Sequence, residues 1–177
     1  MYKIIENYLP ENNFNDIINY IEYSHLLWFF CRKPNKNSKE TDFQLMHVMI
    51  DHGKKCFNFT DYEYDIVKKL ISPLNLNRKN KKFEITRLRM NMFLKTVDYQ
   101  NELGYHVDLE APYIGFKTLL LYLEDSNGYT EFKDTKERIE SKRNRAIVFD
   151  SNIEHQTITQ TDIPIRRNIN INFKEIQ

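Results

Sequence analysis

The chain has 177 residues, which is enough for one domain with a sizeable hydrophobic core. Lysine and arginine total 26 against 25 for aspartate and glutamate, so the charge balance does not favour binding to nucleic acid or to an anionic membrane surface. The longest apolar run, Leu26 to Cys31, is far too short to cross a membrane, and we see no signal peptide at the N-terminus. The two cysteines are Cys31 and Cys56, so we expect buried thiols in a cytoplasmic protein.

The first part of the chain contains one clear amphipathic pattern. Apolar residues recur every three or four positions over residues 11–23 and predict a helix there, directly after Pro10. Around this helix we expect two short strands and a polar loop, at residues 2–9, 26–30 and 32–41. Residues 41–50 fit either a strand or a helix.

A second amphipathic helix is expected further along the chain. Thr60-Asp61 is a good N-cap, and the helix should end before Ser72-Pro73 because proline disfavours helical continuation. The basic run at residues 77–82 favours a solvated loop over a binding patch.

From residue 83 onwards the pattern changes to short strands separated by turns. Residues 117–124 form a nearly continuous apolar run, as in a strand covered on both faces. Asn127-Gly128 is a strong signal for a hairpin turn, and Asn144 can adopt the left-handed conformation in the turn at 142–145. We expect eight strands, at residues 83–94, 106–108, 117–124, 129–132, 137–140, 146–149, 155–159 and 167–173.

Eight short strands at this spacing predict a mostly β protein, with a jelly-roll barrel core and helices packed outside it. The sequence contains no internal repeat and no domain boundary that we can identify. Residues 1–177 should therefore form a single domain, in which residues 1–82 support a β core at residues 83–174.

The last expected strand separates into an apolar and a polar face. By alternation, one face carries Arg167, Ile169, Ile171 and Phe173, and the other carries Arg166, Asn168, Asn170 and Asn172. If the apolar face packs against the helices, the polar face points into the barrel. A buried guanidinium without an anion is costly, so the interior should contain an anion that matches Arg166. The alternative is an edge strand whose asparagines face water.

A metal site is suggested by His106-Val107-Asp108, since alternation in a strand would place His106 and Asp108 on one face. This short motif also fits a local ion pair. His155 follows at a distance, and Arg166 comes eleven positions later on the last strand. Two histidines and one carboxylate are the ligand set that suits Fe(II) with open coordination positions. An open pair of positions can chelate a 2-oxo acid, whose far carboxylate needs a cationic partner such as Arg166.

The order of these motifs is similar to that of a known enzyme superfamily. The segments that match are His106-Val107-Asp108, Asn127 to Phe132, Arg145 to Phe149, His155, and Arg166 to Phe173. In these the sequence resembles the Fe(II)- and 2-oxoglutarate-dependent oxygenases, especially small phage-encoded members and the prolyl 4-hydroxylase-like group. The resemblance covers residues 83–174 and, more loosely, the N-terminal helices.

The resemblance implies a double-stranded β-helix, which is a cupin-like jelly roll, and a set of site residues. His106, Asp108 and His155 match the iron ligands, and Arg166 matches the residue that binds the C5 carboxylate of 2-oxoglutarate. Arg167 is the competing candidate for that carboxylate, but it shares its face with the isoleucines. Dioxygen would be the second cosubstrate, with ascorbate supporting activity.

A narrower similarity points to two further cosubstrate contacts. Arg166-Arg167-Asn168-Ile169 looks like the Arg-Tyr-Asn-Leu run of the DNA-repair demethylases of this superfamily. Asn91-Met92-Phe93 stands where those enzymes have Asn-x-Tyr, although Phe93 lacks the hydroxyl group. Asn91 and Asn168 are therefore candidates for the cosubstrate pocket.

The resemblance implies hydroxylation of a peptide, of the prolyl type, or of a small molecule, with release of succinate and CO2. If the gene belongs to a phage, the location would be the host cytoplasm. One alternative is a catalytically silent metal-binding β-helix domain. Others are a cupin-like enzyme that uses the metal without 2-oxoglutarate, and a nucleic-acid demethylase of the same superfamily. The sequence does not identify the substrate.

Overall fold

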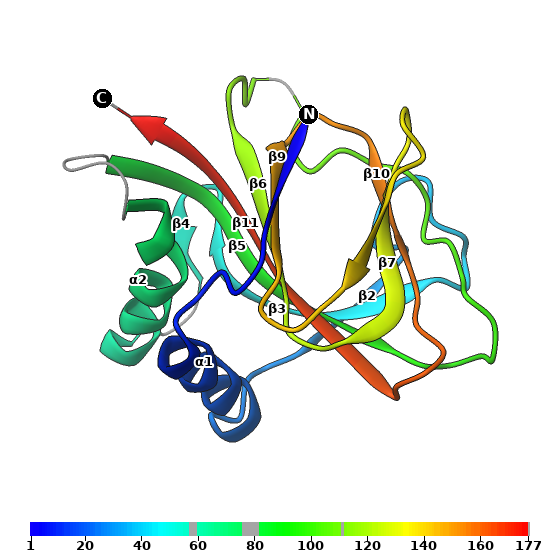
Figure 1. Ribbon diagram of the computed structural model, residues 1–177, viewed down its shortest axis with the longest axis horizontal. Helices are drawn as coiled ribbons and strands as arrows, with labels where there is room; N and C mark the ends of the chain where they lie inside the picture. Colours follow the sequence, from blue (N-terminus) through cyan, green and yellow to red (C-terminus); the bar gives the residue numbers. More distant parts are fainter. Residues whose placement is uncertain (57–59, 76–81, 111, 177) are drawn as a thin grey trace.

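The computed structural model describes residues 1–56, 60–75, 82–110 and 112–176. Within these ranges it contains two helices outside a mostly β core (Figure 1). The elements in chain order are β1 (Tyr2–Ile5), α1 (Glu11–Tyr23), β2 (Phe29–Arg32), β3 (Phe43–Asp51), β4 (Lys54–Lys55), α2 (Asp61–Asn75), β5 (Lys82–Leu94), β6 (Lys117–Tyr122), β7 (Ser126–Phe132), β8 (Arg138–Ser141), β9 (Ala146–Asp150), β10 (His155–Ile158) and β11 (Ile165–Ile176). This is the jelly-roll architecture expected from the sequence.

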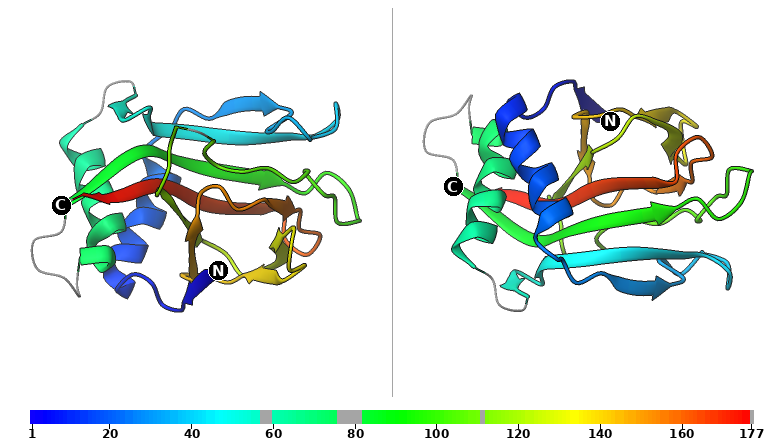
Figure 2. Two further views of the ribbon diagram at one scale, coloured as in Figure 1. Left: turned by 90° about the horizontal axis from the view of Figure 1, so that it is seen from above. Right: turned by 90° about the horizontal axis from the view of Figure 1, so that it is seen from below.

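Two antiparallel sheets form the core. The large sheet has the strand order β1-β9-β6-β11-β5-β3-β2, with β4 paired to β3, and the small sheet has the order β10-β7-β8. Both helices lie against one face of the large sheet, while the small sheet lies over part of its opposite face (Figure 2). The space between the two sheets is the interior of the barrel.

The main hydrophobic core lies between the helices and the large sheet. Phe14 and Ile17 of α1 and Leu70 of α2 are fully buried against Ile169 and Ile171 of β11. The apolar face of the last strand therefore packs on the helices, as predicted. A second apolar cluster fills part of the space between the sheets, and it consists of Leu120, Tyr122, Phe132, Ile139, Ile147 and Phe149.

The start of α2 confirms the predicted N-cap. The backbone N–H of Glu63 donates to the Thr60 hydroxyl at 3.3 Å, and the Glu63 carboxylate accepts the Thr60 N–H at 2.6 Å. This reciprocal pair is a capping box, which satisfies two backbone donors that the first helical turn leaves unpaired.

The predicted end of α2 is wrong, because the helix continues to Asn75 with Pro73 inside it. Proline has no N–H, so the carbonyl of Lys69 loses its usual helical donor. The Ser72 hydroxyl donates to that same carbonyl at 2.9 Å. Ser72 thus replaces the missing hydrogen bond, and the helix continues past the proline.

The predicted hairpin turn at Asn127-Gly128 is also wrong, because both residues lie inside β7. The strand register shifts between Ser126 and Tyr129, which marks a bulge. The Asn127 side chain exchanges two hydrogen bonds with Thr161, at 2.8 and 2.9 Å. The turn-forming residues therefore serve a bulge that ties β7 to the loop before β11.

Other boundaries differ from the predictions by a few residues. The first strand stops at Ile5, the strand expected at 26–30 occupies Phe29–Arg32, and the ambiguous stretch at 41–50 is a strand. Residues 77–81 of the basic run lie outside the described residues. Cys31 and Cys56 are free thiols and only partly buried. Over the ranges that the structure describes, neither helix combines the length and apolarity needed to span a membrane.

Asn144 adopts the left-handed conformation that was predicted for its turn, with φ of 60°. Its buried side chain accepts a hydrogen bond from the Leu9 N–H at 2.9 Å and donates to the Leu9 carbonyl at 2.8 Å. Its backbone carbonyl also accepts the Tyr8 N–H at 2.8 Å. One turn residue thereby holds the segment before α1 against the β core.

We expect Asn144→Ala to lower the free energy of unfolding by about 3 kcal/mol, because it strands two buried backbone groups and forces alanine into a left-handed conformation. Asn144→Gly removes the same hydrogen bonds without that backbone cost, so it should be about 1 kcal/mol less destabilising. Urea unfolding of both variants measures the difference. Equal stability of Asn144→Ala and wild type would contradict this account of the turn.

Candidate active site

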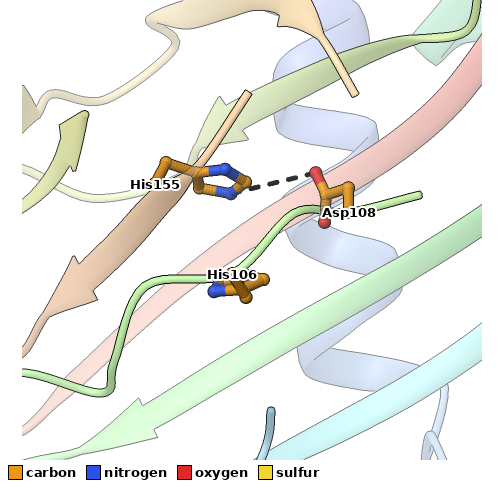
Figure 3. Close-up of side chains that lie close together, drawn as sticks. All are labelled: His106, Asp108 and His155. Carbon is orange, nitrogen blue, oxygen red and sulfur yellow. Dashed lines mark ion pairs between the residues drawn. The ribbon is translucent and has the colours of Figure 1, made fainter. Parts of the chain in front are cut away.

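Two histidines and one aspartate come together inside the barrel. The ligand atoms of His106, Asp108 and His155 all lie within 4.8 Å of one another. His155 opens β10, while the other two residues belong to the loop between β5 and β6 (Figure 3). Nε2 of His155 lies 3.9 Å from Oδ2 of Asp108. The three groups that the sequence singled out are therefore neighbours in space.

The expected strand at residues 106–108 does not form, and a single β-bridge takes its place. His106 and His155 exchange two backbone hydrogen bonds, each of 2.9 Å. The Asp108 N–H donates to the carbonyl of Ser151 at 2.9 Å. This segment is thus positioned by the turn before β10 and not by the regular sheet, yet both side chains still face the same point.

Local carbonyls set the orientation of both imidazoles. Nδ1 of His155 lies 3.0 Å from the carbonyl of Ile153, and Nδ1 of His106 lies 3.3 Å from that of Gly104. A carbonyl can only accept a hydrogen bond, so each contact requires an N–H on Nδ1. The lone pair then belongs to Nε2, which is the arrangement seen in metal-binding histidines.

Asp108 has an unusually complete set of partners. Its side chain is fully buried, and Oδ1 accepts a hydrogen bond from Arg87 at 2.8 Å. Oδ2 accepts from the Thr118 hydroxyl at 2.6 Å, and the Asn170 amide lies 3.1 and 3.2 Å from the two oxygens. Burial would raise the pKa of Asp108, but Arg87, the two histidines and Arg89 together hold it well below its usual range. The carboxylate is therefore ionised in the absence of metal.

His106 is kept neutral by its surroundings. Burial first, and then the neighbouring His155, lower the pKa of His106 to about 4, against 6.5 for a free side chain. A neutral imidazole is the form that binds a metal ion. The site therefore presents a carboxylate and an unprotonated His106 at neutral pH.

The polar face of β11 points into the barrel, as predicted, and is buried along its whole length. Exposed fractions are 1% for Arg166, 3% for Asn168, 5% for Asn170 and 0% for Asn172. The alternative of an edge strand is wrong, because β11 lies between β6 and β5.

The polar residues of β11 form a row, and each of its three asparagines lies opposite a polar residue of β5. Asn168 pairs with Asn91, Asn170 with Arg89, and Asn172 with Arg87. The Asn91 side-chain amide donates to Oδ1 of Asn168 at 2.8 Å, while Oδ1 of Asn91 is buried and has no hydrogen-bond partner among the residues that the structure describes. Both candidate cosubstrate residues therefore line the interior between the metal site and Arg166.

Arg166 has no neutralising partner among the described residues. Its guanidinium donates one hydrogen bond, to the Ile158 carbonyl at 3.1 Å, and its Nε is buried and unpaired. The ring of Phe93 lies 5.0 Å from the guanidinium carbon. Gly128 leaves room for the group, since a Cβ there would come within 2.9 Å of it. Burial lowers the pKa of Arg166 to about 10, so the group remains charged at neutral pH.

Arg167 points to the other side of the sheet, as the face argument predicted. Its Nε lies 2.6 Å from Glu124, and its guanidinium lies 3.4 Å from Glu22 of α1. Arg167 is therefore neutralised on the helix side, whereas Arg166 remains unneutralised inside the barrel.

A cavity adjoins the two histidines. Its lining comes from β3, β5, β6, β10, β11, the loop after β2 and the loop between β5 and β6, and includes Asn35, Gln44, Arg89, Asn91, Phe93, His106, His155 and Asn168. Arg166 does not line the cavity itself, but Phe93, which is paired with it on β5, does. The loop after β2 forms part of the cavity wall, and its Asn35 donates to the carbonyl of Leu103 at 2.8 Å. Gly104 packs so closely on this loop that a Cβ would come within 2.6 Å of the Asn37 carbonyl.

Three features of the site were not predicted from the sequence: Arg87 and Arg89, which lie beside Asp108, and the loop after β2. A signal was present in residues 83–94, where period-two alternation places Arg87, Arg89 and Asn91 on one face. That alternation predicts the strand, but it does not by itself indicate which face points into the barrel. No comparable signal marks the loop after β2, whose role depends on contacts with distant residues.

Comparisons with known proteins support the fold. No protein-family model matches the sequence, and no curated protein matches it either. An oxidoreductase of the 2OG-Fe(II) oxygenase family from Burkholderia pseudomallei has a similar structure, with a TM-score of 0.72 and 10% identity over 98% of this chain and 85% of that one.

Two further solved structures are informative. A prolyl hydroxylase from Trichoplax adhaerens, in complex with a hypoxia inducible factor peptide fragment, has a TM-score of 0.63 and 15% identity over 98% of this chain and 83% of that one. HygX from Streptomyces hygroscopicus, with nickel, 2-oxoglutarate and hygromycin B bound, has a TM-score of 0.61 and 10% identity over 98% and 82%. The chain therefore has the jelly-roll fold of the 2OG-Fe(II) oxygenases, as the sequence resemblance implied.

Proposed function

We propose that the protein is a non-haem Fe(II)- and 2-oxoglutarate-dependent dioxygenase that hydroxylates a peptide or a small molecule. The observation that supports this most strongly is the charge pattern of the barrel interior. A buried, unneutralised Arg166 lies at one end of a polar row, and a His-Asp-His cluster lies beside the other end. Asn170, which contacts Asp108, is four residues from Arg166, or about 13 Å along the strand.

The residues present fit a divalent iron ion. His106 and His155 offer Nε2, and Asp108 offers Oδ2 while Arg87 holds its other oxygen. Two imidazoles and one carboxylate form a set that leaves further positions for other ligands. When bound, iron would supply the oxidative decarboxylation of 2-oxoglutarate to succinate and CO2, coupled to hydroxylation of the substrate.

Arg166 would bind the distal carboxylate of 2-oxoglutarate. A guanidinium fork matches a carboxylate. The Arg166 fork is buried without an ion-pair partner in the described parts of the chain, and a bound dianion would offset the cost of that burial. Asn91 and Asn168 lie along the row and would orient the cosubstrate. Phe93 lines the cavity next to Arg166, so its ring would border the bound cosubstrate.

The substrate is proposed as a peptide or a small molecule because both classes occur in the named complexes of similar fold. The charge balance gives no support to a nucleic-acid substrate. The silent-domain alternative predicts that metal binds without turnover, and the cupin-like alternative predicts that Arg166 is dispensable.

A decarboxylation assay tests the proposal. Purified protein with Fe(II), ascorbate, oxygen and 2-oxoglutarate should form succinate slowly without added substrate, and His155→Ala should abolish this. Absence of succinate from the wild type, together with no measurable affinity for 2-oxoglutarate in the presence of Mn(II), would reject the proposal.

Arg166→Met should abolish binding of N-oxalylglycine, an inert analogue of 2-oxoglutarate, while Mn(II) still binds. Without ligands the variant should be at least as stable as wild type, because an uncompensated buried charge is removed. Calorimetric titration and urea unfolding measure the two effects. Arg32→Gln, at an exposed ion pair with Glu40, is the matched control and should behave as wild type. Retained analogue binding by Arg166→Met would support the cupin-like alternative.

Gly128→Ala should weaken N-oxalylglycine binding by about tenfold or more, because the new methyl group displaces the Arg166 guanidinium. The guanidinium is the end of a flexible side chain, so the free energy of unfolding should change little. Mn(II) affinity should stay as in wild type. Unchanged affinity for the analogue would show that Arg166 does not hold it in the position described.

The metal-free protein should lose stability as the pH falls from about 6.5 to about 4. His106 binds a proton more weakly in the folded state than in the unfolded chain, so acid favours the unfolded state by up to roughly 3 kcal/mol across that window. Urea unfolding with a chelator present measures this slope. His106→Gln should flatten it, and an equal slope in both proteins would contradict the lowered pKa.

A further inference from the structure

A second arginine, Arg89, lies in the cavity and has no role in the proposed cosubstrate site. It belongs to the interior face of β5, and it lines the cavity together with His106 and His155. Its side chain is only 19% exposed. It is therefore a cation held beside the candidate metal centre, in contact with the cavity that a substrate would enter.

Arg89 lacks adequate neutralisation in the described part of the chain. It makes no hydrogen bond there, and its Nε is buried without a partner. The nearest carboxylate is Asp108, at 3.9 Å, which already accepts hydrogen bonds from Arg87 and Thr118. A largely buried guanidinium with five donors and no acceptor is costly unless a ligand supplies one.

In the proposed enzyme complex no anion balances the positive charge of Arg89; this step rests on the proposed function. Iron(II) with Asp108 leaves one positive charge, and Arg166 adds a second. The 2-oxoglutarate dianion neutralises these two. Arg87 and Arg89 then remain as excess positive charge, and only Arg87 is in direct contact with a carboxylate, at 2.8 Å.

The same cavity is lined by a second polar side chain that lacks hydrogen-bond partners among the described residues. The Gln44 side chain, from β3, is 7% exposed and makes no hydrogen bond to any described residue. An amide and a guanidinium that both lack partners form a donor-rich surface. The planar guanidinium fork matches a planar carboxylate in particular.

We propose that Arg89 binds a carboxylate of the substrate, so that the enzyme acts on an acid such as an amino acid, a hydroxy acid or a peptide with a free carboxyl group. The carboxylate would take the acceptor position that the protein leaves empty at Arg89. The carbon to be hydroxylated would then lie between Arg89 and the two histidines. Arg89 is thus a specificity-determining residue and not a metal or cosubstrate ligand.

Paramagnetic relaxation tests this with defined probes. The protein is first loaded with Mn(II) and N-oxalylglycine, which occupy the metal site and Arg166, and acetate is then titrated. In the wild type we expect saturable broadening of the acetate methyl proton resonance by Mn(II), with much weaker broadening of acetamide. In Arg89→Gln the acetate affinity should fall by about tenfold or more. Arg89→Lys keeps the charge and should lose less, and Arg32→Gln, at an exposed site, should match wild type.

The loading step separates this inference from the proposed function. If Mn(II) and N-oxalylglycine do not bind the wild type, the proposed function fails and the inference fails with it. If Arg89→Gln loses N-oxalylglycine itself, Arg89 is a cosubstrate residue and the inference is wrong. Equal broadening by acetate and acetamide, or unchanged acetate binding in a loaded Arg89→Gln, also overturns it.

Discussion

The structure depends on β11, because its two faces lie in different environments. On one face of β11, Ile169 and Ile171 are fully buried against the helices, and on the other face Arg166 and Asn170 are buried inside the barrel. A one-residue shift in register would exchange these faces and place the guanidinium in the hydrophobic core. The apolar packing of the helices therefore fixes the position of the charge inside the barrel.

A buried polar interior is costly to fold unless it has partners. Hydrogen bonds within the chain offset part of this cost of burial. Asn91 donates to Asn168, and Asp108 accepts hydrogen bonds from Arg87, Thr118 and Asn170. The remaining cost is concentrated in buried atoms that lack hydrogen-bond partners among the described residues, including Nε of Arg87, Arg89 and Arg166. Such a distribution is typical of a site completed by ligands and not of a structural core.

Much of the fold and part of the site could be predicted from local patterns. The helix at 11–23 and the two faces of the last strand follow from periodicity, which depends on each residue's near neighbours. The errors have two causes. Contacts with residues far along the chain explain two of them: His106 forms a single bridge to His155 of β10, so residues 106–108 form no strand, and Asn127 binds Thr161 in the loop between β10 and β11. The third is local, because the Ser72 hydroxyl compensates for Pro73 within the helix.

The site residues also divide into those that sequence motifs predict and those that only the fold reveals. His106, Asp108, His155 and Arg166 were predicted because their order along the chain resembles that of a known superfamily. Arg89 has no counterpart in that resemblance, and only the register of β5 against β11 shows that it shares the interior with them. The place of Arg89 in the site is thus set by strand pairing, which sequence motifs do not reveal.

The central claim is that the His-Asp-His cluster and Arg166 act at the two ends of one bound dicarboxylate. A crystal structure of the protein with Mn(II) and N-oxalylglycine tests this most directly, because Mn(II) can be located by its anomalous scattering. We expect one strong peak bonded to His106, Asp108 and His155, with the distal carboxylate of the analogue on Arg166. A metal bound elsewhere, or an analogue that leaves Arg166 without an anion, would contradict it.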